Sequence, residues 1–273
     1  MWPYHLNHAL ILHTLNTMSL LSKQHKRIII KVGSAVLTDD LGRVKKKILN
    51  NIARDIAALK DRKIILVSSG AIAIGKRLLN IEKINSIEES QALAAIGQIE
   101  LIKAWKTAFK PYFIDVGQVL LTPKEIQTNK DAKNALKTIK QLHDFKVLPI
   151  VNENDTTATD EIQFGDNDLL AAKLAKIFKA DLLIMLSAVE GLYESFDHAE
   201  KKLKLVRRVS RITKDIHAMA GKASKSGKGG MISKIDAAKI ILSMNSDMVI
   251  SKGDAINPLI RLKKSSTSTW FKK

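Results

Sequence analysis

Short apolar runs and longer segments of helical periodicity alternate along the chain from Arg27 onward. Runs such as Arg27–Val32 have the length and β-branched composition of buried strands, whereas segments such as 90–109 repeat apolar residues three and four apart, as amphipathic helices do. Predicted strands are 27–32, 64–68, 112–121, 147–151, 181–186 and 247–251, and predicted helices are 44–60, 71–79, 90–109, 131–144, 166–178 and 231–244. Residues 156–164 predict a hairpin or an exposed ribbon.

This alternation predicts βαβ units and a mainly parallel sheet. Ligands of such sheets bind outside the carboxyl ends of the strands. The segments that follow the predicted strands are rich in glycine and short polar residues: Gly33-Ser34, Ser69-Gly70, Asn152–Asp155, Ser187 and Gly253.

Composition narrows the class of protein. The 273 residues fit one large or two small domains, and the absence of cysteine excludes disulfides, thiolate metal sites and cysteine nucleophiles. No apolar stretch predicts a membrane span, so a cytoplasmic protein without a membrane partner is expected.

The net charge of +18 raises the alternative of a nucleic-acid-binding protein. Aromatic residues make up 5% of the chain, which is poor material for stacking bases, and the lysines are scattered through amphipathic segments. Half of the excess lies between Glu200 and Lys239, where a polyanion such as ATP would be favoured, although a solvated basic face is the plainer alternative. We therefore expect no nucleic-acid partner.

The two ends of the chain differ from its middle. Residues 1–26 contain no acidic residue and precede the first predicted strand, so we expect a dispensable N-terminal extension. Residues 263–273 are rich in lysine, serine and threonine and predict a basic, peripheral tail.

Two lysines follow patterns that suit phosphate. Lys31 ends a strand before the small turn at Gly33 and Ser34, whose backbone N–H groups would approach the same oxygens. Lys234 lies one turn inside the helix that follows the glycine loop 226–230, where exposed amides and a positive charge coincide. The alternatives are a strand-end lysine that reaches solvent and a mobile surface loop.

Residues 70–77 nearly match the GxxxxGK[ST] phosphate loop. Arg77 stands where the magnesium-binding hydroxyl is required, and no second metal-binding strand follows. We reject a phosphate loop and expect these small residues to admit a substrate carboxylate.

Two clusters of asparagine and aspartate provide the densest signal. Asn152–Asp155 follows a strand, and Gly165–Asp168 precedes a helix. Such groups could bind an ammonium and a carboxylate together, or hold lysines and a metal in place, whereas the alternative is a set of turn formers and helix caps. Since no histidine-based catalytic set accompanies them, the pattern favours a nucleophile that is already ionised, such as a carboxylate.

In order along the chain, KVGSAVL, VSSGAIAIG, QALAAIGQ, VGQVLLT, VNEND, FGDND and GKGGMISK resemble the glutamate 5-kinases of the amino acid kinase superfamily over about residues 27–262. The resemblance implies an α/β fold, a three-layer αβα sandwich with a mainly parallel central sheet. It also implies transfer of a phosphoryl group from ATP to the L-glutamate side chain, the first step of proline biosynthesis.

The resemblance further implies roles for single residues. Lys31 and Lys234 would stabilise the transferring phosphoryl group, and Asp168 would hold both lysines. Glutamate would contact Ser69, Gly70, Asp155, Asp166 and Asn167. The nucleotide would lie along Lys31, Gly33, Ser34, Ser187, Ala188 and the loop formed by Lys228, Gly229, Gly230, Met231, Ile232, Ser233 and Lys234. Mg²⁺ would be held mainly by ATP oxygens, without a metal site made by the protein. A homo-oligomer and functional coupling to glutamyl-phosphate reductase are also implied.

Three departures from the family pattern concern the nucleotide and the chain length. Ser187-Ala188 replaces the common Thr-Asp, and Lys228 replaces a threonine. The chain stops too early to include the PUA domain of many members. The alternatives are sister kinases for acetylglutamate, aspartate or uridylate, which would need another acceptor pocket.

Overall fold

The structure is a computed structural model that describes residues 25–273 apart from 60, 123, 127–129, 131, 158–166, 195–203, 222–229 and 264–266. Its strands are β1 (Arg27–Val32), β2 (Lys63–Ser68), β3 (Val116–Leu121), β4 (Leu148–Glu153), β5 (Leu182–Ser187), β6 (Arg208–Val209), β7 (Asp247–Lys252) and β8 (Ser268–Phe271). Its α-helices are α2 (Ser34–Leu37), α3 (Lys46–Ala57), α4 (Ala71–Leu78), α5 (Ile87–Phe109), α6 (Lys133–Asp144), α7 (Asn167–Phe178), α8 (Lys214–Met219) and α9 (Met231–Ser243). Short 3-10 turns are η1 (Lys110–Tyr112), η2 (Lys124–Ile126), η3 (Asp155–Thr157) and η5 (Ile260–Lys263).

The strands form one sheet in the order β3-β4-β2-β1-β5-β7-β8-β6. From β3 to β7 all neighbours are parallel, whereas β8 runs antiparallel to β7. Because β2 and β5 flank β1 on opposite sides, the order of the sheet reverses at β1, and such a reversal is where open α/β sheets bind ligands.

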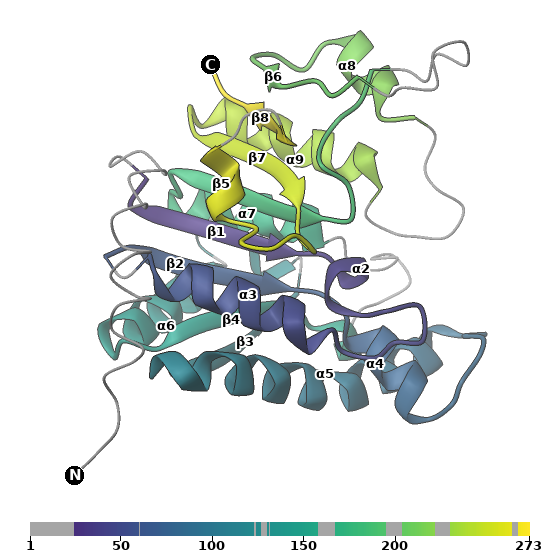
Figure 1. Cartoon of the computed structure of the whole chain (residues 1–273). Helices are drawn as coiled ribbons and strands as arrows, with labels where there is room; N and C mark the ends of the chain where they lie inside the picture. Colours follow the sequence, from purple (N-terminus) through teal and green to yellow (C-terminus); the bar gives the residue numbers. More distant parts are fainter. Residues whose placement is uncertain are drawn as a thin grey trace.

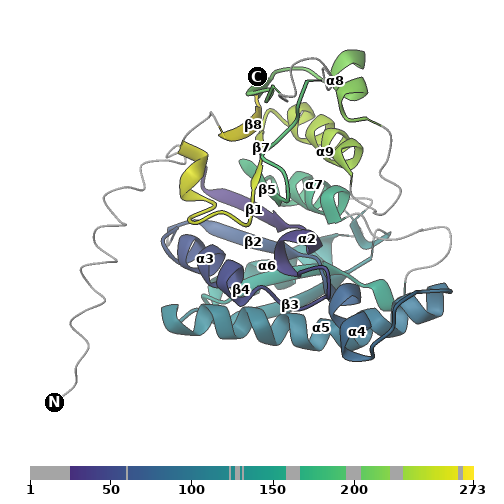
Figure 2. The same ribbon diagram turned by 45° about the vertical axis from the view of Figure 1, so that its right-hand side comes forward.

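Helices cover both faces of this sheet (Figures 1 and 2). On β1, Ile28 and Ile30 pack toward one face with α3 and α5, and Ile29 packs toward the other with α7 and α9. Strands buried on both faces read as continuous apolar runs, which is why the sequence predicted them clearly. The predicted αβα sandwich is therefore confirmed.

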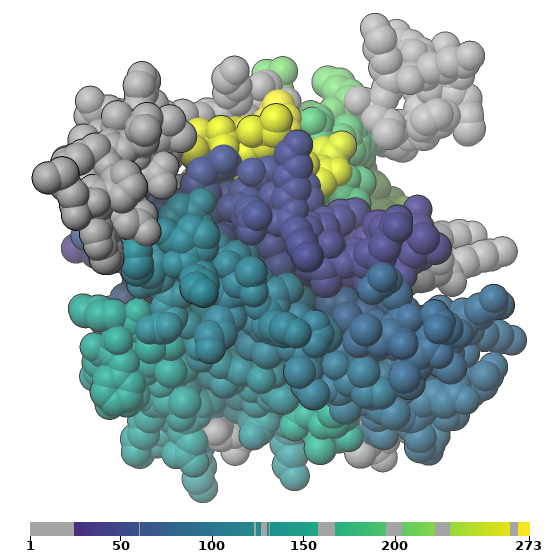
Figure 3. Space-filling model, turned by 60° about the horizontal axis from the view of Figure 1, so that its bottom comes forward, coloured from purple at the N-terminus to yellow at the C-terminus, as the bar shows by residue number. Residues whose placement is uncertain are grey.

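The close packing of α4 against α5 explains why glycines occur in the segment that resembles a phosphate loop. Gly70 caps α4 with φ +112°, a conformation that glycine adopts without strain. A Cβ on Gly75 would lie 2.0 Å from the Leu93 carbonyl oxygen, and one on Gly97 would lie 1.8 Å from the Ala71 carbonyl oxygen. These glycines let two helix backbones touch. In Figure 3 the blue-to-teal part of the chain, which includes α4 and α5, covers much of the visible face.

The structure departs from the predictions at both ends. Ser268–Phe271 form β8, and Phe271 is fully buried in the core that contains α7 and α9. The expected peripheral tail is wrong for these residues, because the edge of β7 offers the hydrogen-bond partners that a short Ser-Thr-Trp-Phe segment lacks alone. At the other end, His25 is 4% exposed and Lys26 donates its backbone N–H to Asp181, so both belong to the fold; residues 1–24 lie outside the described residues.

Three local differences have simple causes. The strand expected from residue 112 begins at Val116, because Pro111 lies in η1 and Phe113 has φ +55°. Residues 156–157 lie in η3, and the rest of the expected ribbon at 158–164 is outside the described residues. The short helices α2 and α8 were not predicted, since four and six residues are too few for a periodic signal.

Candidate active site

Turns at the carboxyl ends of the central strands are tied to neighbouring strands. The Gly33 N–H donates to the Leu186 carbonyl at 3.1 Å, joining the turn after β1 to β5. The Ser69 N–H donates to the Val32 carbonyl at 3.1 Å, and the Gly253 N–H donates to the Ser187 carbonyl at 2.8 Å. These bonds hold the predicted binding segments along one edge of the sheet.

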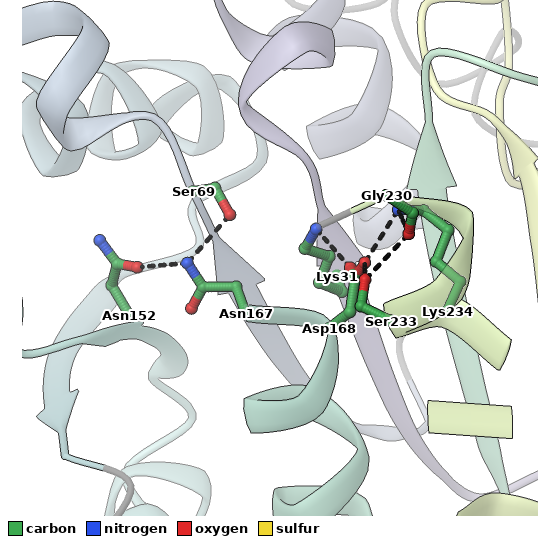
Figure 4. A network of polar contacts seen from close by, with 8 residues as sticks. All are labelled: Lys31, Ser69, Asn152, Asn167, Asp168, Gly230, Ser233 and Lys234. Carbon is green, nitrogen blue, oxygen red and sulfur yellow. Dashed lines mark hydrogen bonds and ion pairs between the residues drawn. The ribbon is translucent and has the colours of Figure 1, made fainter. Parts of the chain in front are cut away.

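An ionic cluster lies at this edge (Figure 4). The Lys31 Nζ is 2.5 Å from one oxygen of Asp168, and the Lys234 Nζ is 2.8 Å from the other. The Ser233 Oγ lies 2.9 Å from that second oxygen and 2.9 Å from the Gly230 carbonyl oxygen. One carboxylate thus fixes two ammonium groups that lie 203 positions apart in the sequence.

Asp168 is fully buried, and the two lysines are 6% and 7% exposed. Burial by itself raises the pKa of Asp168, but the ammonium groups of Lys31 and Lys234 and their hydrogen bonds outweigh it and hold the pKa below the usual aspartate value. The carboxylate therefore stays ionised. Two ammonium groups against one carboxylate leave a net positive charge, which suits an anionic phosphate.

Helix geometry places these side chains. Asp168 lies in the first turn of α7, and Lys234 lies in the first turn of α9, which begins after Gly230. Side chains of helical residues lean toward the N-terminus of their helix, so both groups point back toward the strand ends where Lys31 emerges. The positive ends of the two helix dipoles lie at these first turns and add positive potential.

A second, uncharged cluster adjoins the first, because Asn167 directly precedes Asp168. The Asn167 Nδ2 donates to the Ser69 Oγ and to the Asn152 Oδ1, both at 3.0 Å. The Asn152 Nδ2 donates to the Gln98 Oε1 at 2.7 Å. The Asn167 Oδ1 is buried and has no hydrogen-bond partner among the described residues. Figure 4 shows Ser69, Asn152 and Asn167 of this cluster beside the ionic cluster.

The other predicted residues lie on the segments that adjoin these clusters. Gly33 and Ser34 open α2, Gly70 caps α4, and Asp155 begins η3. Ser187 and Ala188 end β5, and Met231 and Ile232 begin α9. The predicted residues Asp166, Lys228 and Gly229 lie outside the described residues.

Asn152 and Gln98 are polar members of the site that residue-by-residue prediction missed. Asn152 belongs to the quoted VNEND motif, so the motif signal could have identified it. Gln98 ends the quoted QALAAIGQ motif on α5, but that motif does not indicate a contact with a residue 54 positions away.

The carboxylates of this site do not suggest a protein-made metal cage. Both Asp168 oxygens already face ammonium groups, and the described part of the chain contains no group of three or more acidic or histidine side chains with metal-binding geometry. In the same described part, no helix combines the length and apolarity that crossing a membrane requires.

Comparison with known proteins gives a consistent result. Residues 26–252 match the sequence model of the amino acid kinase family. The chain is 44% identical over 261 residues to a glutamate 5-kinase of Agrobacterium fabrum, covering 93% of this chain and 67% of that relative. It is 45% identical over 253 residues to a glutamate 5-kinase of Pelagibacter ubique, covering 91% and 69%. Carbamate kinase from Giardia lamblia bound to AMP-PNP shares the fold, with a TM-score of 0.60 and 17% identity over 92% of this chain and 99% of the other.

The fold is that of the amino acid kinase family, and the chain belongs to this family of phosphotransferases. Within that family it groups with the glutamate 5-kinases, and the resemblance carried by the sequence motifs is confirmed.

Proposed function

We propose that this chain transfers the γ-phosphoryl group of ATP to the side-chain carboxylate of L-glutamate and forms L-glutamyl 5-phosphate and ADP, the first step of proline biosynthesis. The observation that supports this most directly is the junction at Asn167 and Asp168. These consecutive residues bring a partly buried amide cluster next to a pair of buried ammonium groups. An acceptor and a phosphate donor could bind side by side there.

The chemistry needs no general base. A glutamate carboxylate is ionised at neutral pH, so its oxygen attacks the γ-phosphorus directly while the bond to the bridging oxygen of ADP breaks. The transfer moves negative charge onto the ADP oxygen. Positioning and charge stabilisation then provide most of the rate enhancement.

Lys31 and Lys234 act on the phosphates in this proposal, and Asp168 is a positioning residue that fixes both ammonium groups. Each lysine gives one of its three N–H donors to Asp168, and the Lys234 Nζ also lies 3.5 Å from the Gly230 carbonyl oxygen; in this proposal both ammonium groups turn further donors to anionic oxygens when ATP binds. Preorganised charges of this kind stabilise a transition state without reorganisation during the reaction.

Glutamate binds, in this proposal, at Ser69, Gly70, Asn167 and Asp155, with Asp166 in support. The positive φ of Gly70 opens the first turn of α4, so backbone N–H groups there can approach a carboxylate. Asp155 provides negative charge for the substrate ammonium.

The nucleotide lies along Gly33 and Ser34, along Ser187 and Ala188, and along residues 228–234. Ser187-Ala188 lacks the acidic residue common at this position in the family, so we expect a weaker preference among nucleotides. The extra charge of Lys228 would attract the phosphates of any nucleotide and so raise affinity without restoring that preference.

Mg²⁺ supplies charge neutralisation and orients the phosphates when it is bound. Because the Asp168 oxygens are engaged by lysines, we place the ion on ATP oxygens and water.

The product is an acyl phosphate, which water hydrolyses readily, so coupling to glutamyl-phosphate reductase would limit its loss. Assembly as a homo-oligomer and a cytoplasmic location, where ATP and glutamate are abundant, complete the proposal.

A trapping assay tests the reaction. The purified chain with ATP, Mg²⁺, L-glutamate and hydroxylamine should form γ-glutamyl hydroxamate together with an equal amount of ADP. Reactions without ATP, and reactions with L-aspartate or N-acetyl-L-glutamate as acceptor, are the controls. Turnover of either control acceptor without turnover of glutamate would refute the proposed substrate.

A further inference from the structure

Three side-chain amides form a continuous row that starts outside the residues assigned to substrate. Gln98 on α5 contacts Asn152 at the end of β4 at 2.7 Å, and Asn152 contacts Asn167 on α7 at 3.0 Å. The row thus joins three elements from the two helical layers and the sheet. It ends at the Asn167 Oδ1.

The orientation of the row is set by a backbone group. The Glu153 N–H donates to the Asn152 Oδ1 at 2.9 Å, and a backbone N–H can act only as a donor. The Asn152 amide therefore turns its oxygen toward Glu153 and its nitrogen toward Gln98, whose Oε1 accepts. The second lone pair of the Asn152 Oδ1 accepts from the Asn167 Nδ2.

Asn167 is oriented in turn. Both protons of its Nδ2 are engaged, by Asn152 and by the Ser69 Oγ. Its Oδ1 is consequently turned away from both partners, and this oxygen is buried without a hydrogen-bond partner in the described part of the chain. A buried acceptor left in this state is costly, so the site is built for a donor that arrives with a ligand.

Glutamate carries one donor group at neutral pH, its ammonium, because both carboxylates only accept. We infer that Gln98 is a positioning residue: it fixes the Asn152 amide and, through it, presents the Asn167 Oδ1 to the ammonium of the substrate. This inference rests on the proposed function.

Gln98 is needed as an acceptor because water cannot reach the Asn152 side chain to replace it. Asn152 is 2% exposed, so its Nδ2 has no solvent to replace a lost acceptor. Without the Gln98 oxygen, the Nδ2 of Asn152 would lack an acceptor, and rotation of the Asn152 amide would become favourable. Asn167 could then turn its own NH₂ group toward the substrate ammonium. A donor facing a donor repels, so binding of the ammonium would weaken.

Two variants separate this role from simple packing. Gln98→Met keeps the length of the side chain and removes the acceptor, whereas Gln98→Glu keeps an oxygen for the Asn152 Nδ2. Ile99→Ala, at the neighbouring position of α5 and 66% exposed, is the control. The measurements are kcat, the KM of glutamate and of ATP, the inhibition constant of glutarate, which lacks the amino group, and the melting temperature.

We expect Gln98→Met to raise the KM of glutamate about tenfold, as loss of one partner of a buried hydrogen bond does. The kcat, the KM of ATP and the inhibition constant of glutarate should stay within about twofold, and Gln98→Glu should restore most of the affinity for glutamate. Equal weakening of glutamate and glutarate, or no change in either, would overturn the inference while leaving the reaction intact. A wild-type chain inactive on glutamate would instead remove the proposed function, and the inference with it.

Discussion

Asp168 is a buried carboxylate with two ammonium partners, so its ionisation should be coupled to folding. Its pKa in the folded chain lies below the value in the unfolded chain. A group with a depressed folded pKa stabilises the fold above its unfolded pKa, about 3.9 for aspartate, and loses that contribution as the pH falls through the folded pKa.

Asp168→Asn should therefore lower the free energy of unfolding by about 3 kcal/mol at pH 7, as breaking a buried ion pair does. The deficit should begin to shrink below about pH 4, where the carboxyl of the unfolded wild-type chain takes up a proton, and should shrink further as the pH falls through the lower pKa of the folded state. Urea unfolding between pH 7 and pH 3 measures it. Asp144→Asn, which removes an exposed pair with Lys140, should change stability little at any pH. A deficit that is independent of pH would contradict the coupling.

Lys234 and Asp155 should affect different kinetic constants. Lys234→Ala removes charge that acts on the phosphoryl group in the transition state, so kcat should fall by roughly 10²-fold or more, with little change in the KM of glutamate. Asp155→Ala and Asp155→Asn should both chiefly raise that KM, because a lost ground-state contact weakens binding uniformly. Steady-state kinetics separate the two, with Lys239→Ala on the exposed side of α9 as the control. Reversed effects would show that the two roles are exchanged.

Single residues also show what sequence can and cannot provide. Lys31, Asp168 and Lys234 each lie in a short motif at the end of a predicted element, so they could be singled out before the structure was known. Gln98 also lies in a quoted motif, QALAAIGQ, but its role could not be predicted, because that role depends on a backbone N–H of β4 and on a contact across layers. The Asn167 oxygen, which has no hydrogen-bond partner within the described ranges, likewise owes this state to the direction of an amide, which no pattern of residue types specifies.

At the scale of elements, the contact between α4 and α5 depends on the absence of side chains. Gly97→Ala would gain about 0.5–1 kcal/mol of helix propensity. However, the new Cβ would lie 1.8 Å from the Ala71 carbonyl oxygen and 2.7 Å from the Gly75 nitrogen, and backbone atoms cannot move away as a side chain can. Overpacking of this kind typically costs about 1–3 kcal/mol, and the severity of this overlap places it at the upper end.

We therefore expect Gly97→Ala to lose about 2 kcal/mol of stability in urea unfolding. Gly230→Ala is the matched control, since a Cβ there meets nothing within 4 Å and should leave stability within about 0.5 kcal/mol. Because α4 begins directly after Ser69 and Gly70, a shift of α4 in the Gly97→Ala protein should also weaken the binding of glutamate. Unchanged stability would mean that the two helices can move apart without loss.

The strands that are buried on both faces were the elements most clearly predicted from the sequence. The central strands β1, β2, β4 and β5 are apolar on both faces and were identified from their runs alone. The strand β8 was not, because four residues rich in serine and threonine become a strand only where β7 leaves an unpaired edge. Helix α8 similarly depends on its Thr213 cap, a signal too short to distinguish from a turn.

At the scale of the whole molecule, the two residues just before β1, His25 and Lys26, are bonded to the sheet. The His25 Nε2 lies 3.2 Å from an Asp247 carboxylate oxygen, and its carbonyl accepts a hydrogen bond from Arg62. The Lys26 carbonyl accepts from the Lys63 N–H at 2.9 Å. These contacts join β1 to β2 and to β7, on either side of the point where the order of the sheet reverses.

Two shortened chains test where the fold begins. A chain that starts at Met18 keeps these contacts, so its free energy of unfolding should stay within about 0.5 kcal/mol of the full chain and its activity should be unchanged. A chain in which Arg27 follows the initiator methionine loses the buried His25 and leaves the carboxylates of Asp247 and Asp181 without these partners, so it should lose about 2 kcal/mol or more. Urea unfolding of both chains decides the matter. If the Met18 chain were as unstable as the Arg27 chain, residues 1–17 would contribute to the core; if both matched the full chain, the contacts of His25 and Lys26 would contribute nothing to stability.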